Sequence, residues 1–431
     1  MSPDRMTLRI SPNRRYLLDS EGRPFFYLAD TAWRLLYRLD RAETDHYLCD
    51  RAAKGFNAIQ FVVFDIRYQP NRFGHAPYMD DDPTRPNEAF FEHLDWVIGR
   101  CAELGMYAVL LPNWGYVVTA RSPGGEHYLE RPLVDQSNAY AQGLFLGRRY
   151  RDRPVIWMLG GDQPEHGKSE VFRLQAAGIA EGDDGAGLIT YHPRGQASSS
   201  QWFHNAAWCD FNSLQSGHLL DNPNWQMIEH DWSLDPPKPT LDSEPMYENM
   251  PQFLRDFRPR ADAWHVRKQA YWAVFSGACG HTYGCNDVFM FWRPGGPEPT
   301  FGANLPWPIA LQLPGSHQMR FLKELIESVP DYCSRIPDDD LIVRVDRAAD
   351  RGHVCATSSS DRRMVLCYTS HGHGFTLDMD SLAANSIRSR WFDPRAGDYG
   401  AESIVPARAF HTFAPPKTGE GYDWVLRLET A

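Results

Sequence analysis

Two acidic residues follow short buried runs and are placed to act as a catalytic pair. Asp162 comes directly after the apolar run 155–159 and the glycines at 160 and 161. Glu244 lies in PTLDSEP, at 239–245, where the following proline biases its backbone toward an extended conformation. Glycoside hydrolysis needs two such groups, one to protonate the departing oxygen and one to stabilise or attack the anomeric carbon. We expect Asp162 to be the general acid/base and Glu244 the nucleophile.

Each acid also has a simpler interpretation. Asp162 lies three residues before Glu165, so the two could be a capping pair for the next helix, although Ser169 is itself a good cap for that helix. Glu244 could be a solvated loop acid or the partner of a nearby arginine. Asp242, two residues earlier on the same face of an extended strand, is the rival to Glu244.

The elements that position these acids alternate between strands and helices from residue 25 to about 328. Apolar runs without polar alternation are typical of parallel strands covered on both faces. Eight such strands are predicted, at 25–33, 57–64, 106–115, 155–159, 188–193, 211–218, 239–245 and 280–284. Helical patterns include 41–56, 87–105, 137–154, 169–181, 263–278 and 317–329. The pattern predicts a (β/α)8 TIM barrel over residues 1–336.

The last hundred residues have a different character. After PDDD at 337–340, short β-rich runs such as MVLCYTS and DWVLRLE alternate with turn signals, and no helical pattern appears. This favours a small C-terminal antiparallel β-sandwich over residues 337–431.

In a (β/α)8 barrel the carboxyl ends of the strands meet at one face, where the active site lies. We therefore expect the polar and aromatic residues at the strand ends to bind substrate. Imidazole and carboxylate groups would hydrogen-bond sugar hydroxyls, and Trp114 would stack on a sugar ring. The predicted substrate-binding residues are Asp30, Trp33, Gln60, Asn113, Trp114, His192, Gln215, His218, His281 and Tyr283.

Composition argues against several other classes of protein. Lys and Arg number 44 against 55 Asp and Glu, a net charge of −11, and no basic run is present, so nucleic acid and anionic membranes are poor partners. No transmembrane run or secretory signal appears, which favours a cytoplasmic enzyme, or a periplasmic or secreted one if a leader was trimmed. The eight cysteines lack metal-ligand spacing and are expected to be reduced thiols.

No cofactor or metal is predicted. The sequence contains neither a GxGxxG nor a P-loop motif, and its histidines do not form HxH or HExxH pairs. A metal-dependent hydrolase would require histidines that meet only in space. Another alternative to a glycosidase is a non-catalytic carbohydrate-binding protein on a decayed barrel, which would not need the carboxylate pair. A hydrolysis assay on aryl glycosides separates it from an enzyme.

Six motifs resemble a known family. FFYLADTAW, RAAKGFNAIQ, WMLGGD, TYHPRG, LDSEP and GHTYG, in this order, are similar to the apiosidase-like glycoside hydrolases of glycoside hydrolase family 140. The tail resembles the collagen-binding-type β domain that follows them, so the resemblance covers roughly residues 8–430. It implies a (β/α)8 hydrolase that removes terminal sugars, the characterised activity being release of apiose from pectic side chains, with the catalytic pair on Asp162 and Glu244.

These observations lead us to expect an exo-acting glycosidase that retains anomeric configuration. Strands four and seven of a barrel lie across from each other, and two carboxyl groups about 5 to 5.5 Å apart leave no room for a water between acid and sugar. Substrate choice would depend on loops such as 64–82.

Overall fold

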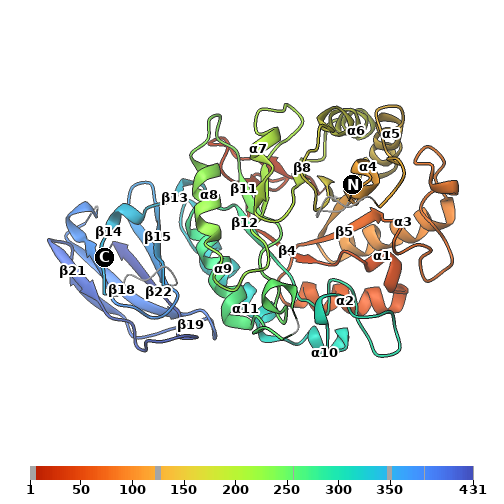
Figure 1. The fold of residues 1–431 in the computed structure, drawn as a ribbon. Coiled ribbons are helices and arrows are strands. Elements are labelled where there is room, and N and C mark those ends of the chain that lie inside the picture. Colours follow the sequence, from red (N-terminus) through yellow and green to blue (C-terminus); the bar gives the residue numbers. More distant parts are fainter. Residues whose placement is uncertain (1–5, 122–127, 256, 347–351, 383, 431) are drawn as a thin grey trace.

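The chain folds into a barrel of parallel strands followed by a β-rich tail (Figure 1). The computed structural model describes residues 6–121, 128–255, 257–346, 352–382 and 384–430. The barrel strands are β4 (Tyr27–Thr31), β5 (Ala58–Phe64), β6 (Tyr107–Asn113), β7 (Val155–Gly160), β8 (Ile189–His192), β10 (Asn212–Gln215), β11 (Thr240–Asp242) and β12 (Gly280–Tyr283). The predicted (β/α)8 fold is confirmed.

The barrel is nearly closed. Its strands pair in parallel in the order β8-β7-β6-β5-β4-β12-β11-β10, and the short β9 (Ala197–Ser198) adds an antiparallel edge to β10. The seam between β8 and β10 is joined by side chains and by a main-chain hydrogen bond from the Asp210 amide to the Ile189 carbonyl at 2.8 Å, instead of a strand ladder. Thr190 Oγ1 donates to the Phe211 carbonyl at 2.6 Å, and the Ile189 amide donates to Asp210 Oδ2 at 2.7 Å.

Helices surround the barrel, close to the predicted ranges. They are α1 (Leu35–Arg38), α2 (Arg41–Ala53), α3 (Glu88–Glu103), α4 (Tyr116–Thr119), α5 (Ala139–Tyr150), α6 (Ser169–Gly182), α7 (Ser200–Phe203), α8 (Asn224–Trp232), α9 (Ala263–Phe275), α10 (Trp307–Ala310) and α11 (Pro314–Glu327). Short 3-10 turns are η1 (Met79–Asp81), η2 (Gln252–Leu254), η3 (Thr300–Gly302), η4 (Tyr332–Ser334), η5 (Asp339–Leu341) and η6 (Met379–Ser381).

Local sequence explains where individual helices begin and how closely they pack. Asp40 caps α2 in a reciprocal box with Glu43. Helix α11 begins three residues before the predicted start because Pro314 occupies its first turn, where a missing amide hydrogen costs nothing. Helices α5 and α6 approach each other through glycines. A Cβ on Gly143 would lie 2.2 Å from the Gln175 carbonyl oxygen, and one on Gly178 equally close to that of Tyr140.

Three short strands precede the barrel and were not predicted. They form an antiparallel sheet of β1 (Arg9–Ile10), β2 (Leu17–Leu18) and β3 (Pro24–Phe25). Tyr16, next to β2, is fully buried and donates its hydroxyl hydrogen to the Arg335 carbonyl at 2.6 Å. This hydrogen bond links the N-terminal sheet to the start of the tail.

The tail contains two antiparallel sheets, coloured blue in Figure 1. One has the order β13-β15-β16-β22-β18-β19, with β20 on β18, and the other has the order β14-β17-β21. The strands are β13 (Arg335–Pro337), β14 (Ile342–Val345), β15 (Val354–Ser359), β16 (Met364–Thr369), β17 (Phe375–Asp378), β18 (Ser386–Asp393), β19 (Asp398–Tyr399), β20 (Ser403–Pro406), β21 (Phe410–Phe413) and β22 (Trp424–Thr430). The predicted small antiparallel β domain is confirmed.

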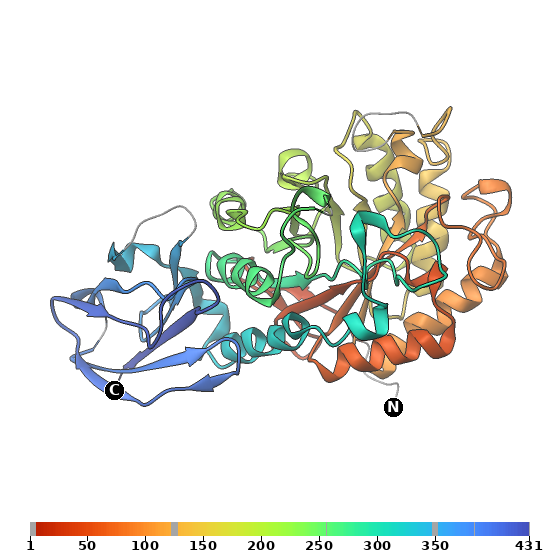
Figure 2. The same cartoon turned by 60° about the horizontal axis from the view of Figure 1, so that its bottom comes forward.

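The tail packs against helices α9 and α11, as both views show (Figures 1 and 2). Arg267 on α9 makes a two-pronged ion pair with Asp423, at 2.7 and 2.5 Å, and both side chains are buried. The rings of Tyr271 and Tyr368 stack with centroids 4.7 Å apart. Buried tail residues such as Leu366 belong to the same apolar cluster as the barrel core. The two parts therefore share a continuous core.

All eight cysteines are free, six of them buried. None of the helices that the structure describes has the length and apolar content needed to cross a membrane.

Candidate active site

The loop after β7 presents Asp162 at the barrel mouth. Gly160 and Gly161 have φ values of +85° and +110°, which side chains rarely adopt. Neighbouring main chain also excludes larger residues, since a Cβ on Gly160 would lie 2.5 Å from the His192 carbonyl oxygen. Asp162 itself has a φ of 54°. The chain thus accepts an unfavourable backbone conformation to place this carboxylate.

Asp162 does not cap the following helix. Helix α6 begins at Ser169 with Lys168 in the cap position, so the prediction that Ser169 is the cap is wrong. Glu165 serves the helix start instead, because its carboxylate accepts from the amide of Ser169 at 2.5 Å and from that of Gly167 at 2.8 Å. Asp162 is left available to the cavity.

Glu244 lies two residues past β11 and is only 5% exposed. Three side chains surround its carboxylate. Tyr247 donates its hydroxyl hydrogen to Oε1 at 2.7 Å, while Nε2 of His192 lies 2.9 Å from Oε2 and Nε2 of His218 lies 3.4 Å from Oε1. Groups of this kind stabilise the ionised form of a carboxyl.

His192 connects the two acids. The amide of Asp162 donates to its Nδ1 at 3.3 Å, which in the neutral ring leaves the hydrogen on Nε2, facing Glu244. The carbonyl oxygen of Pro193 also lies 2.9 Å from Nδ1. The position of the catalytic loop and the orientation of the imidazole are therefore coupled.

The pKa values of the two acids are displaced in opposite directions. Burial, together with the negative charge of Glu244, raises the pKa of Asp162 to about 7. Burial would also raise the pKa of Glu244, but the contacts with His192 and His218 outweigh it and hold that pKa well below its usual range. Near neutral pH the pair contains a proton on Asp162 and a charge on Glu244. Environments that separate two carboxyls in this way assign one as acid and the other as nucleophile or base.

A cavity of about 600 Å³ opens above the pair. Its wall is rich in aromatic groups, among them Trp33, whose ring meets that of Trp114 edge to face at 5.2 Å. The indole nitrogen of Trp33 donates to the Tyr247 hydroxyl at 3.1 Å, which fixes the ring beside Glu244. Rigid aromatic walls with a few convergent polar groups are typical of sites that bind sugar-sized ligands.

Six of the predicted site residues line this cavity. They are Trp33, Trp114, Asp162, Gln215, His218 and Glu244. His192 lies behind the wall, fully buried against Glu244.

The other predicted residues are buried within the barrel strands and do not line the cavity. Asp30 is fully buried and accepts from Arg51 and from Tyr47, both at 2.6 Å. Its position is explained by this internal ion pair. Tyr283 likewise donates to Glu248 at 2.5 Å.

Two buried amides and one imidazole complete this internal group. Gln60 donates to the Ser243 carbonyl at 2.9 Å and so supports the residue before Glu244. Asn113 forms a reciprocal amide pair with Gln142, at 3.0 and 2.9 Å. Burial lowers the pKa of His281 to about 3, which keeps that ring neutral.

Several cavity residues were not predicted. Arg67 donates two hydrogen bonds to the carboxylate of Asp65, at 3.1 and 2.9 Å. The guanidinium of Arg34 lies 3.8 Å from the ring centroid of Tyr68. Three of them, Asp65, Arg67 and Tyr68, belong to the loop 64–82 that was expected to influence specificity. Tyr247 follows Glu244 by three residues, a spacing that carries no recognisable pattern.

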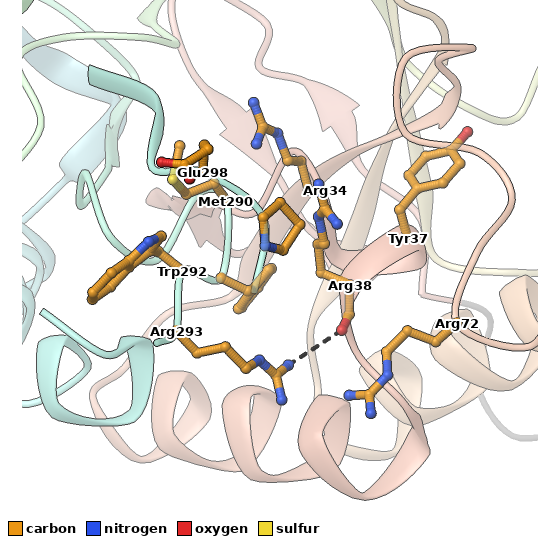
Figure 3. Close-up of a pocket in the computed structure, with 10 residues that line it drawn as sticks. Arg34, Tyr37, Arg38, Arg72, Met290, Trp292, Arg293 and Glu298 are labelled. Carbon is orange, nitrogen blue, oxygen red and sulfur yellow. Dashed lines mark hydrogen bonds between the residues drawn. The ribbon is translucent and has the colours of Figure 1, made fainter. Parts of the chain in front are cut away.

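A second, basic pocket adjoins the cavity, and Arg34 lines both. It encloses about 230 Å³ and presents four arginines, Arg34, Arg38, Arg72 and Arg293, drawn in Figure 3. Arg72 and Arg293 share the carboxylate of Glu43. Within the residues that the structure describes, no carboxylate forms an ion pair with Arg34 or Arg38. Arg34 is nonetheless engaged, because it is buried and its guanidinium donates to the hydroxyls of Tyr68 and Thr300. Arg38 is therefore the cation left to an anionic ligand.

Comparison with known proteins agrees with this geometry. The family described as "Apiosidase-like, catalytic domain" matches residues 11–332, and "Putative collagen-binding domain of a collagenase" matches residues 336–429. A solved structure named "Glycoside hydrolase" is 30% identical, with a TM-score of 0.90 over 99% of this chain and 97% of its own. A glycoside hydrolase family 5 protein from Bacteroides vulgatus is 32% identical, with a TM-score of 0.90 over 99% and 93%. Among curated proteins, none matches the sequence.

Proposed function

The chain belongs to the apiosidase-like family of glycoside hydrolases, and from this premise we propose that it releases a terminal sugar, apiose or a similar pentose, from pectic or related plant glycans. The observation that carries the proposal is the opposed protonation of its two acids. The raised pKa of Asp162, about 7, supplies a proton at neutral pH, and the lowered pKa of Glu244 supplies a charge. A protein that only bound sugars would gain nothing from this arrangement.

The reaction would proceed in two steps. Asp162 donates its proton to the glycosidic oxygen while Glu244 attacks the anomeric carbon, so the glycosidic bond breaks as the bond to Glu244 forms. Asp162, now ionised, takes a proton from a water molecule, whose oxygen displaces Glu244 and regenerates both groups. Two inversions at the same carbon retain its configuration. The short contacts of Glu244 with His192 and Tyr247 support a fixed, ionised nucleophile.

Two features support a charged glycan as the substrate and its chain end as the point of attack. The cavity holds about 600 Å³, which suits one or a few sugar units. The basic pocket next to it offers Arg38, and guanidinium groups bind carboxylates well. A terminal sugar in the cavity and a uronate carboxylate in the basic pocket would together define a pectic substrate.

The test is product analysis with a panel of pectic oligosaccharides that carry different terminal sugars. Anion-exchange chromatography should detect one released monosaccharide, a pentose, and none should appear with Asp162→Asn or Glu244→Gln on the same panel. Release of internal fragments would contradict the exo mode, and release of a hexose would contradict the substrate class. Saturable binding without any hydrolysis would leave a carbohydrate-binding protein.

A further inference from the structure

Three metal-ligating side chains meet where the barrel joins the tail. Glu229 comes from helix α8 of the barrel, Asp339 from the turn η5, and His353 from the residue before strand β15. One ligand atom of each lies within 4.8 Å of those of the other two. None of the three lines the catalytic cavity. The cluster therefore needs an explanation apart from glycoside cleavage.

The spacing of His353 and Asp339 does not fit an ordinary hydrogen bond. Nε2 of His353 lies 3.5 Å from Oδ2 of Asp339, beyond the roughly 2.7 to 3.2 Å of an N–H···O bond. Two ligands on one tetrahedral zinc ion, with bonds of about 2.0 to 2.2 Å, are about 3.4 Å apart. The observed separation matches that of two atoms sharing a cation.

Neighbouring groups hold both ligands in place. The ring of His353 stacks on Trp225 with centroids 3.9 Å apart and an interplanar angle of 15°, and its carbonyl accepts from Trp272 Nε1 at 3.1 Å. Oδ1 of Asp339 accepts from the Ala356 amide at 2.6 Å, which leaves Oδ2 free to face His353. Nε2 of His353 is buried and has no hydrogen-bond partner among the residues described. Such fixed orientation is typical of metal ligands.

The local charge favours a cation. Three carboxylates, those of Glu229, Asp338 and Asp340, act on Asp339 through their negative charge. Across the described part of the chain, no lysine or arginine forms an ion pair with Glu229 or Asp339.

We propose that Glu229, Asp339 and His353 bind one zinc ion, which links the tail to the barrel. One imidazole and two carboxylates, with water in the fourth position, form a ligand set that zinc accepts. Calcium takes six to eight oxygens, more than this cluster provides, and magnesium prefers a shell of oxygens and water. Because the ligands come from both parts of the chain, the ion would act as a structural clamp.

The test is titration calorimetry of the full chain with zinc chloride, after treatment with a chelator and dialysis. One ion should bind per chain, and His353→Ala and Glu229→Gln should each weaken binding at least tenfold. The matched control is His230→Ala, because His230 is the exposed neighbour of Glu229 on the same helix. Removing this imidazole should leave the affinity unchanged.

Thermal unfolding provides a second readout if the alanine variant folds poorly. Zinc should raise the melting temperature of the wild type and of His230→Ala but not that of Glu229→Gln, which alters a partly exposed helix position. Failure of the wild type to bind zinc, binding that both ligand variants retain, or tighter binding of calcium than of zinc would each overturn the proposal. Because the readouts are binding and melting, these outcomes are independent of whether the chain cleaves pectic glycans.

Discussion

Replacing Asp162 by asparagine should abolish acid catalysis while preserving the shape of the site. A carboxyl with the ordinary pKa of 3.8 would hold its proton in less than roughly 0.1% of molecules at pH 7. At a pKa of about 7 the proton is present in roughly half of them, an increase of nearly three orders of magnitude. Since general acid catalysis contributes about 10²- to 10⁴-fold, Asp162→Asn should lower kcat/KM by that factor for glycosides with poor leaving groups.

Activated aryl glycosides provide the discriminating substrate, because their departure needs little protonation. For these, kcat/KM should fall less than about tenfold in Asp162→Asn. The pH profile gives a second readout. Wild-type kcat/KM should decline as the pH rises through about 7, where the coupled pair loses its proton, and this decline should be absent from the variant.

The matched control is Glu165→Gln. Glu165 lies in the same loop as Asp162, and its carboxylate accepts from the Ser169 amide at the start of α6. This variant should keep the wild-type pH profile and lose only some stability, about 0.5 to 2 kcal/mol. Equal losses of kcat/KM on poor and activated leaving groups, or a basic limb that survives in Asp162→Asn, would refute the assignment of Asp162 as the acid.

Four further predictions concern the nucleophile, the tail and the basic pocket. His218→Asn removes a contact that lowers the pKa of Glu244, so the acidic limb of kcat/KM should move to higher pH; an unmoved limb would contradict this role. Proton NMR should show the retained anomer first, and initial appearance of the inverted anomer would make Glu244 a base. Deleting 337–431 should yield insoluble protein, because it takes Asp423 from Arg267 and exposes tail-facing aromatic side chains of α9 such as Tyr271; a soluble, active truncation would contradict this. Arg38→Gln should raise KM for uronate-containing glycans but not for neutral aryl glycosides, and an equal effect on both would argue against an anionic subsite.

The barrel strands were predictable because parallel strands covered on both faces give uninterrupted apolar runs. The run 155–159, for example, becomes β7 (Val155–Gly160), which is buried along its length. Features held by side chains across long sequence separations were not predictable. Three examples join residues that no local pattern relates. They are the hydrogen bond of Asp210 across the barrel seam, the hydrogen bond from Tyr16 to the Arg335 carbonyl, and the cluster around His353.

The candidate site residues divide according to their distance past the end of a strand. Five of the residues that line the cavity lie one to three positions beyond the end of a strand: Trp33, Trp114, Asp162, His218 and Glu244. The exception is Gln215, which is the last residue of β10. Those that do not line the cavity are still within strands: Asp30, Gln60, Asn113, His192, His281 and Tyr283.

The physical reason is that a residue within a strand has its direction set by the pleat, so it faces either the barrel interior or the surrounding helices. A residue just beyond the strand is released from the ladder, and its side chain can turn over the mouth. Asp30 and Asp162 look alike in the sequence, each an acid after an apolar run. Asp30 lies inside β4 and meets Arg51 from the next helix, whereas Asp162 lies two residues past β7 and meets the cavity. The glycines at 160 and 161 mark the point where β7 ends, which is why Asp162, unlike Asp30, was recognisable from sequence as a residue of the cavity.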